Sequence, residues 1–106
     1  ETIQYLKSLP PGWSFYSNNT TVIYFQLWQP AYGIPEVYDG VKKTNNPLYP
    51  QNLARMRQFL QQPHTALVIF DPYGSSEEYP PITDLISGLE VVRLMKDGTV
   101  YAAPHP

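Results

Sequence analysis

The stretch that decides the fold of this chain is His64-Thr-Ala-Leu-Val-Ile-Phe-Asp71. Within it, Leu67 to Phe70 form an unbroken apolar run of aliphatic and aromatic residues, bounded in front by Pro63 and behind by the turn-forming segment Asp71-Pro72-Tyr73. A strand with one wet face alternates apolar and polar residues, whereas a strand covered on both faces is apolar throughout. The run is short for a buried helix and is flanked by turn residues, so we predict a central strand over residues 65–70.

Composition limits the class of protein. The chain has 106 residues, a hydrophobic fraction of 42%, a charged fraction of 15% and a net charge of -2. This length predicts one domain with one layered core. The absence of a basic cluster argues against a nucleic-acid partner. The absence of cysteine excludes disulfides, thiolate metal sites and thiol catalysis. No apolar run approaches the length of a membrane span, so we expect a soluble α/β domain.

The other elements follow from periodicity and turn chemistry. We predict a short helix over residues 1–9, a strand from Trp13 to Tyr16, a short strand from Ala31 to Pro35, an exposed loop over 36–46, a helix within Pro47 to Gln62, a helix from Ile82 to Ser87, and a hairpin of Leu89 to Met95 with Thr99 to Ala103. The long helix has Pro50 in its first turn, and Leu53, Met56 and Leu60 form its apolar face. Asp97-Gly98 supplies the hairpin turn.

The segment Thr20 to Trp28 allows two interpretations. Its composition, Thr-Thr-Val-Ile-Tyr-Phe-Gln-Leu-Trp, is typical of a strand. Its position, directly after the capping cluster Ser17-Asn18-Asn19, indicates the first turns of a helix. We predict a helix here.

Together these elements predict an α/β fold in three layers. Alternating helices and strands indicate a mostly parallel sheet of about five strands with helices on both faces. Right-handed crossovers favour the strand order 2-1-3-4-5, numbered along the chain, with an antiparallel hairpin strand at the C-terminal end. We treat residues 1–106 as a single domain.

In such a sheet, ligands bind beyond the carboxyl ends of the strands, where the winding reverses. The two loops expected there supply small polar groups that can bind hydroxyls or phosphate near a helix N-terminus. The candidate ligand-binding residues are Ser17, Asn18, Asn19, Asp71 and Tyr73. A structural interpretation stays open, in which an asparagine caps the helix and Asp71 initiates a turn.

We find no recognisable set of catalytic residues in the sequence. The chain lacks a Gly-rich phosphate loop and a nucleophile elbow. Its two histidines, His64 and His105, are far apart in sequence and have no carboxylate cluster near them. We therefore expect no metal, no cofactor and no catalytic residue in this chain, and whether the protein is an enzyme stays open.

Several short segments, taken in order, resemble a known family. They are Leu6-Lys-Ser-Leu-Pro-Pro-Gly12, Ser14-Phe-Tyr-Ser-Asn18, Ile23-Tyr-Phe25, Leu67-Val-Ile-Phe70, Leu89-Glu-Val-Val92 and Asp97-Gly-Thr-Val-Tyr101. Together they resemble the C-terminal extracytoplasmic domain of bacterial polytopic membrane glycosyltransferases, which are similar to the protein mannosyltransferase and aminoarabinose transferase superfamily. The pattern Tyr16-Ser17-Asn18 followed by Ile23-Tyr24 carries most of the resemblance, and it also supports the helix over residues 20–28.

The resemblance implies location and context. It places the domain on the periplasmic face of a bacterial membrane as part of a membrane protein that uses a lipid-linked sugar. The catalytic acidic residues of that family lie in the membrane portion, so the resemblance implies that this piece is inactive alone. Its partners would be the membrane-embedded portion of its own parent chain and a polyprenyl-phosphate sugar or a glycan acceptor. Because the sequence begins at Glu1 without Met, we expect it to come from a longer chain.

One alternative function stays open. The chain can be a stand-alone extracytoplasmic α/β module that binds a small polar ligand or a protein partner. A small hydrolase or transferase is the weakest hypothesis, because no catalytic set supports it.

Overall fold

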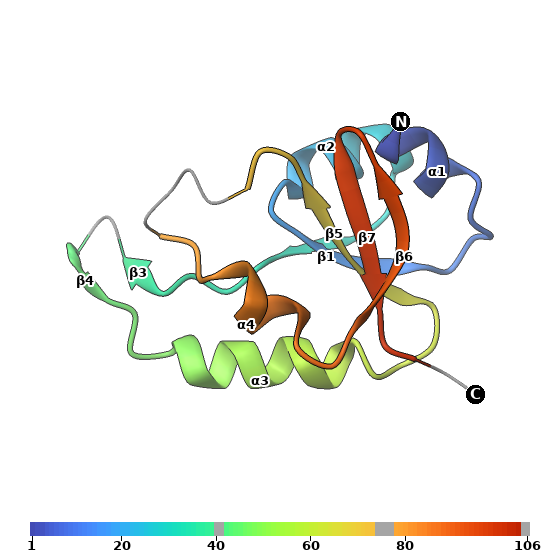
Figure 1. The fold of residues 1–106 in the computed structure, drawn as a ribbon. Helices are drawn as coiled ribbons and strands as arrows, with labels where there is room; N and C mark the ends of the chain where they lie inside the picture. Colours follow the sequence, from blue (N-terminus) through green and yellow to red (C-terminus); the bar gives the residue numbers. More distant parts are fainter. Residues whose placement is uncertain (40–41, 74–77, 105–106) are drawn as a thin grey trace.

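The structure is a computed structural model that describes residues 1–39, 42–73 and 78–104. The elements in chain order are α1 (Thr2–Lys7), β1 (Ser14–Ser17), α2 (Thr20–Leu27), β2 (Ala31–Gly33), β3 (Tyr38–Asp39), β4 (Thr44–Asn45), α3 (Tyr49–Phe59), β5 (Thr65–Phe70), α4 (Ile82–Ile86), β6 (Glu90–Met95) and β7 (Gly98–Ala102). Figure 1 shows α1 and α2 on one side of the sheet and α3 and α4 on the other.

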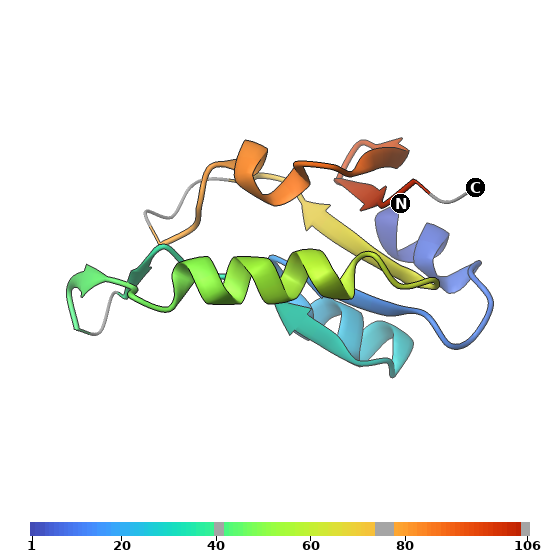
Figure 2. The same ribbon diagram turned by 90° about the horizontal axis from the view of Figure 1, so that it is seen from below.

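The main sheet has five strands in the order β2-β1-β5-β7-β6. The strands β2, β1 and β5 run parallel to one another, whereas β7 is antiparallel both to β5 and to β6. In Figure 2 the sheet runs from β2 at one edge to β6 at the opposite edge. The sheet is therefore mixed, and the mixed α/β class with helices on both faces agrees with the sequence prediction.

The predicted order of the last two strands is wrong. We expected the strand at 89–95 beside the central strand and the returning strand at the edge. Instead β7 pairs with β5, with Val68 opposite Val100, and β6 is displaced to the edge. The physical reason lies in the two strands themselves, because β7 is uncharged and mostly buried while β6 carries Glu90 and Arg93 and is mostly exposed. A charged strand is tolerated at an edge but not in the middle of a sheet.

The central strand behaves as predicted. Successive side chains of a strand point to opposite faces, and all residues of β5 except Phe70 are buried. Ala66 and Val68 belong to a core under α1 and α2, which also contains Leu6, Phe15, Ile23, Met95 and Val100. Leu67 and Ile69 belong to a second core under α3 and α4, which also contains Ile34, Leu53, Met56, Leu60 and Leu85. One uninterrupted apolar strand thus supplies both cores.

The segment after Asn19 is helical, as predicted. The side chain of Asn19 accepts a hydrogen bond from the backbone N–H of Val22 at 3.3 Å, which caps α2. Trp28 ends the helix in the left-handed conformation, with φ of 56°. The capping hydrogen bond stabilises the helix, although the composition of residues 20–28 alone would favour a strand.

The helix α1 is capped from a distant part of the chain. Asp97, in the turn between β6 and β7, accepts hydrogen bonds from the backbone N–H and the hydroxyl of Thr2 at 3.0 Å and 2.7 Å. These bonds lower the pKa of Asp97 to about 2, with the bond from the Thr2 hydroxyl as the largest cause. The C-terminal hairpin is thereby fastened to the first helix.

The segment that we expected to be an exposed loop contains a small ladder. Residues Tyr38 and Asp39 pair antiparallel with Asn45 and Thr44. The backbone N–H of Val37, just before this ladder, donates a hydrogen bond to the backbone carbonyl of Glu78 at 2.8 Å. Among the helices of the described ranges, none is long and apolar enough to cross a lipid bilayer.

Candidate functional site

Asn18 ties together the two loops that the sequence singles out. Its amide nitrogen donates to the backbone carbonyl of Phe70 at 2.9 Å, and its amide oxygen accepts from the backbone N–H of Phe70 at 2.8 Å. The side chain thus imitates one more residue of strand pairing between β1 and β5. The reversal of winding lies between these two strands, so Asn18 bridges them at the point where a ligand was expected to bind.

Ser17 and Asn19 also make local bonds. Ser17 is 1% exposed, and its hydroxyl oxygen accepts a hydrogen bond from the backbone N–H of Asn19 at 3.0 Å. Asn19 is the N-cap of α2. An asparagine of this loop therefore caps the helix, as the structural interpretation predicted. Ligand binding by Ser17, Asn18 and Asn19 stays a prediction.

Asp71 and Tyr73 follow β5 and make their own contacts within the fold. The backbone N–H of Asp71 donates to the carbonyl of Asp97 at 3.0 Å, and the Asp71 side chain is exposed. The hydroxyl of Tyr73 donates to the carbonyl of Pro80 at 2.6 Å, and its ring stacks on Tyr79 with 5.7 Å between centroids. Burial is the largest cause that raises the pKa of Tyr73 to about 12, so its phenol is neutral at physiological pH.

The structure brings part of the predicted set to a hollow. A small hollow of about 150 Å³ is lined by Ser17, Asn18, Thr20, Gly33, Ile34, Glu36 and Tyr79. Asn19, Asp71 and Tyr73 do not line it. The hollow lies beyond the carboxyl ends of β1 and β2, one strand away from the expected crevice between β1 and β5.

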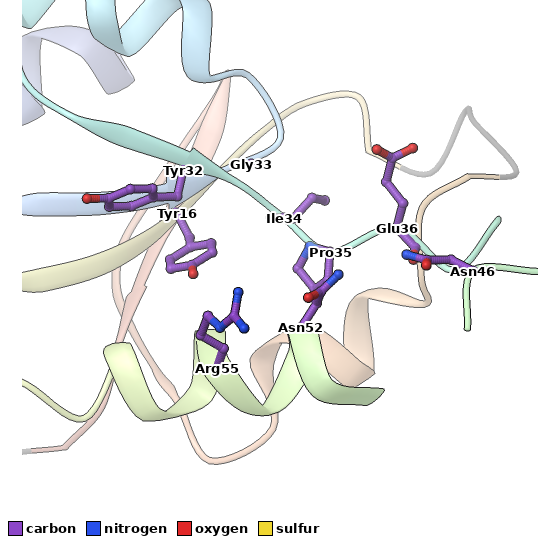
Figure 3. Close-up of a pocket in the computed structure, with 9 residues that line it drawn as sticks. All are labelled: Tyr16, Tyr32, Gly33, Ile34, Pro35, Glu36, Asn46, Asn52 and Arg55. Carbon is purple, nitrogen blue, oxygen red and sulfur yellow. The ribbon is translucent and has the colours of Figure 1, made fainter. Parts of the chain in front are cut away.

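A larger hollow adjoins it on the α3 side of the sheet, with a volume of about 340 Å³. We call it the tyrosine–arginine groove, and its lining residues are Tyr16, Tyr32, Gly33, Ile34, Pro35, Glu36, Asn46, Asn52 and Arg55. Figure 3 shows side chains from two directions, with the tyrosines on the sheet and with Asn52 and Arg55 rising from α3. The groove shares Gly33, Ile34 and Glu36 with the smaller hollow.

Two tyrosine rings form one wall of the groove, and Phe59 packs against both of them. Tyr16 and Tyr32 are paired across β1 and β2, so their rings lie on the same face, 5.5 Å apart. Phe59 of α3 meets Tyr16 edge-on at 5.0 Å and Tyr32 edge-on at 5.5 Å. Edge-to-face contacts of this kind hold rings in fixed orientations. Tyr32 is 49% exposed, so the wall presents aromatic surface to a ligand.

Arg55 is the cation of this groove. No hydrogen bond or ion pair joins its side chain to the residues that the structure describes. Its positive charge acts on Tyr16, where it partly offsets the burial that raises the pKa of that phenol. In Figure 3 the guanidinium points from α3 toward the Tyr16 ring. An arginine with free donors beside neutral hydroxyls is suited to bind an anionic oxygen.

Glu36 marks the opposite end of the groove. The largest cause that raises the pKa of Glu36 is a hydrogen bond that its protonated carboxyl group donates to the Glu78 side chain, followed by burial and by the charges of Glu78 and Asp39. Each of these contacts favours the neutral form of the Glu36 carboxyl group. Figure 3 shows the Glu36 carboxyl turned away from α3, so the acidic and basic ends of the groove are separated.

Gly33 lines both the groove and the smaller hollow. A Cβ atom built on Gly33 meets no atom within 4 Å, and the residue has no positive φ that would require glycine. Because successive side chains of a strand point to opposite faces, a side chain at position 33 would point to the α2 side of the sheet, away from the face that carries Tyr16 and Tyr32. The groove is therefore better tested at Arg55 than at Gly33.

The sequence analysis missed most of this groove. The sequence predicted Tyr16 in a strand, Glu36 in a loop and Arg55 in a helix, and it gave none of the three a role in binding a ligand. One signal was available, since Asn52, Arg55 and Phe59 form an i, i+3, i+7 stripe beside the apolar face of α3. A polar and aromatic stripe next to a buried face indicates a boundary where a groove can form.

The groove offers hydrogen-bond donors and acceptors, aromatic surface and one cation, which suits binding. Among residues 1–39, 42–73 and 78–104, no group of three or more His, Asp or Glu side chains could hold a metal ion. Comparisons of the chain with models of known protein families, with curated proteins and with solved structures find no match.

Proposed function

We propose that this chain is a non-catalytic domain that binds the phosphorylated sugar of a lipid-linked donor, or a glycan acceptor, for a membrane glycosyltransferase. The observation that carries the proposal is the tyrosine–arginine groove, where Tyr16 and Tyr32 face Asn52 and Arg55 across an open space. The chemistry itself would belong to the membrane-embedded portion of the parent chain, as the sequence resemblance implies.

The size and lining of the groove support a sugar. A volume of about 340 Å³ lies at the lower end of the range of small-molecule sites. A sugar ring has apolar C–H faces that pack on aromatic rings and hydroxyls that both donate and accept. The Tyr16 and Tyr32 phenols and the Asn52 amide can each do both. A groove with this lining binds a small polar ring better than it binds an apolar ligand.

The charge of the groove supports a phosphorylated sugar in particular. Arg55 has free donors in a planar fork, which matches the oxygens of a phosphate. The nearest carboxyl group of the lining, Glu36, is turned away and has a raised pKa. An anion at Arg55 therefore meets little repulsion from the opposite end.

The location of the proposed function comes from the resemblance. The segments Ser14-Phe-Tyr-Ser-Asn18 and Ile23-Tyr-Phe25 support an extracytoplasmic domain that is attached to a membrane glycosyltransferase. The coding sequence upstream of Glu1 tests this part directly. A series of long apolar segments there supports the proposal, whereas a cleavable leader directly before Glu1 would replace it with a stand-alone module.

The binding part is tested by nuclear magnetic resonance on the isotope-labelled domain. Three probes are titrated separately: mannose 1-phosphate, farnesyl phosphate and neutral mannobiose. We expect mannose 1-phosphate to shift the backbone amides of Tyr16, Tyr32, Gly33, Asn52 and Arg55, with weaker shifts from mannobiose. Shifts confined to other parts of the domain, or a response to farnesyl phosphate alone, would overturn the sugar site.

A charge-matched pair of variants sharpens the test. Arg55→Gln removes the free guanidinium of the groove, while Arg57→Gln makes the same charge change on the same helix at a side chain bonded to the Asp84 carbonyl at 2.8 Å. A charge-assisted hydrogen bond contributes about 1.5 kcal/mol, or about tenfold in affinity. We expect Arg55→Gln to weaken mannose 1-phosphate about tenfold and mannobiose by less than about twofold. Equal effects of the two variants would contradict the assignment.

A further inference from the structure

The strand β6 leaves one edge of the main sheet open. It is the last strand in the order, it pairs with β7 alone, and in Figure 2 no other element of the described chain lies beyond it. Three apolar side chains at this edge are exposed, with Val91 at 59%, Val92 at 49% and Leu94 at 76%. An edge strand with apolar side chains and free backbone groups is a template for another strand.

A bulge in β6 rearranges which residues share a face. Val91 lies opposite Tyr101, but Arg93 lies opposite Val100, so Val92 is the extra residue. In a regular strand, Glu90 and Arg93 would point to opposite faces. Because Glu90 pairs with Ala102 and Arg93 with Val100, the bulge puts both charged residues on the same face of the sheet. By the same argument Val91 and Leu94 share the other face.

The sequence around the bulge is self-complementary. Read in the two directions, Leu89-Glu-Val-Val-Arg-Leu94 places leucine against leucine, glutamate against arginine and valine against valine. When two copies of this strand pair antiparallel about a twofold axis between Val91 and Val92, Glu90 of each copy lies opposite Arg93 of the other. Residues that lie opposite one another must be on the same face of the sheet. Without the bulge this pairing would set Glu90 opposite an arginine on the wrong face. The bulge makes the pairing possible.

We propose that β6 is a homodimer interface, in which the β6 strands of two copies pair antiparallel and join the two sheets into one. In this pairing Glu90 of each copy faces Arg93 of the other, Leu89 faces Leu94, and Val91 faces Val92. The charges select a second copy of this chain over an unrelated strand, because both opposite-charge pairs arise from a single sequence. The groove lies by β2 at the far edge of the sheet, so the dimer leaves both grooves open and the inference is independent of the proposed function.

Charge reversal tests the interface by sedimentation equilibrium across a range of protein concentrations. We expect the wild-type domain to dimerise. Glu90→Arg and Arg93→Glu each set like charges opposite one another at two symmetric positions, and each raises the dimer dissociation constant by about tenfold or more. The double variant Glu90→Arg with Arg93→Glu restores opposite charges and returns the constant to within about threefold of wild type.

Two controls keep the result interpretable. Arg93 also lies over the Tyr5 ring at 5.5 Å, so its reversal removes a contact within the monomer, whereas Glu90→Arg leaves that contact in place. Lys7→Glu changes an exposed charge on α1 and should leave dimerisation unchanged. Circular dichroism checks that each variant is folded. A wild-type domain that stays monomeric, or a double variant no tighter than the single ones, would overturn the interface.

Discussion

Replacing Asn18 tests how the two parallel strands at the centre of the fold are held together. Its side chain makes two hydrogen bonds to one residue, at 2.9 Å to the Phe70 carbonyl and at 2.8 Å from the Phe70 N–H. Asn18→Ala removes both bonds and leaves both groups of Phe70 without a protein partner. Asn18→Asp keeps the shape and the acceptor but replaces the donor with a carboxylate oxygen that faces a carbonyl.

The magnitudes follow from these contacts. Each hydrogen bond contributes about 1 kcal/mol net, and Phe70 is half-buried, so water restores only part of what is lost. We expect Asn18→Ala to lower the free energy of unfolding by about 2 kcal/mol. In Asn18→Asp, the nearby carbonyl raises the pKa of the new carboxyl group in the folded state. The protonated acid can donate to that carbonyl, so the deficit is smallest below about pH 4 and grows as the pH rises.

Urea unfolding followed by circular dichroism measures these values at pH 3 and pH 7. Urea unfolding of the wild-type protein is also measured at each pH, and each variant is compared with the wild type at the same pH. Asn45→Asp, on the exposed strand β4, is the matched control and should change stability by less than about 0.5 kcal/mol. A deficit for Asn18→Asp that shrinks as the pH rises, or a loss for Asn18→Ala as small as that of the control, would refute the bridging role.

Two further predictions concern the contact between the hairpin turn and α1. Asp97→Ala should lower the free energy of unfolding by about 1 kcal/mol at pH 7, allowing for the exposure of the carboxylate. Hydrogen bonds from Thr2 lower the pKa of Asp97 to about 2. In urea titrations the difference from wild type should therefore disappear as the pH falls from about 4 toward 2. Gly98→Ala should cost about 1–3 kcal/mol in thermal unfolding, since its Cβ would lie 2.7 Å from the Thr2 hydroxyl and 2.9 Å from the Ile69 carbonyl. Gly33→Ala, with open space around it, is the control, and equal losses at the two glycines would contradict the packing.

Local chemistry made parts of the fold predictable. The central strand was predictable because all residues from Leu67 to Phe70 are apolar, and only a strand covered on both faces needs such a run. The helix after Asn19 was predictable because a capping side chain outweighs the strand propensity of the residues that follow. Both signals lie within a few residues of the elements that they decide.

The order of the hairpin strands depends on a comparison between distant segments. A hairpin can join a sheet through either of its strands, and the turn at Asp97-Gly98 does not choose between them. The decisive difference is that β7 is uncharged while β6 carries Glu90 and Arg93, which places β6 at the edge. Comparing the charges of the two strands would have given the observed order.

The groove was hidden for a related reason. Tyr16 and Tyr32 become neighbours only through the register of β1 with β2, and Arg55 reaches them only when α3 packs on the sheet. None of these residues is unusual in its own segment. The loop after β1, by contrast, attracted attention through polar residues that proved to be bonded within the fold, with Asn18 on Phe70 and Asn19 on Val22.

The most direct test of the account is the affinity of mannose 1-phosphate for the wild-type domain and for Arg55→Gln, measured by isothermal titration calorimetry. The Arg55 side chain makes no hydrogen bond or ion pair with the described residues, so its replacement removes the cation of the groove without breaking a contact of the fold. The account predicts at least about a tenfold loss of affinity with an unchanged unfolding transition. Equal affinities for the two proteins would show that the ligand does not enter the tyrosine–arginine groove, and would contradict the account.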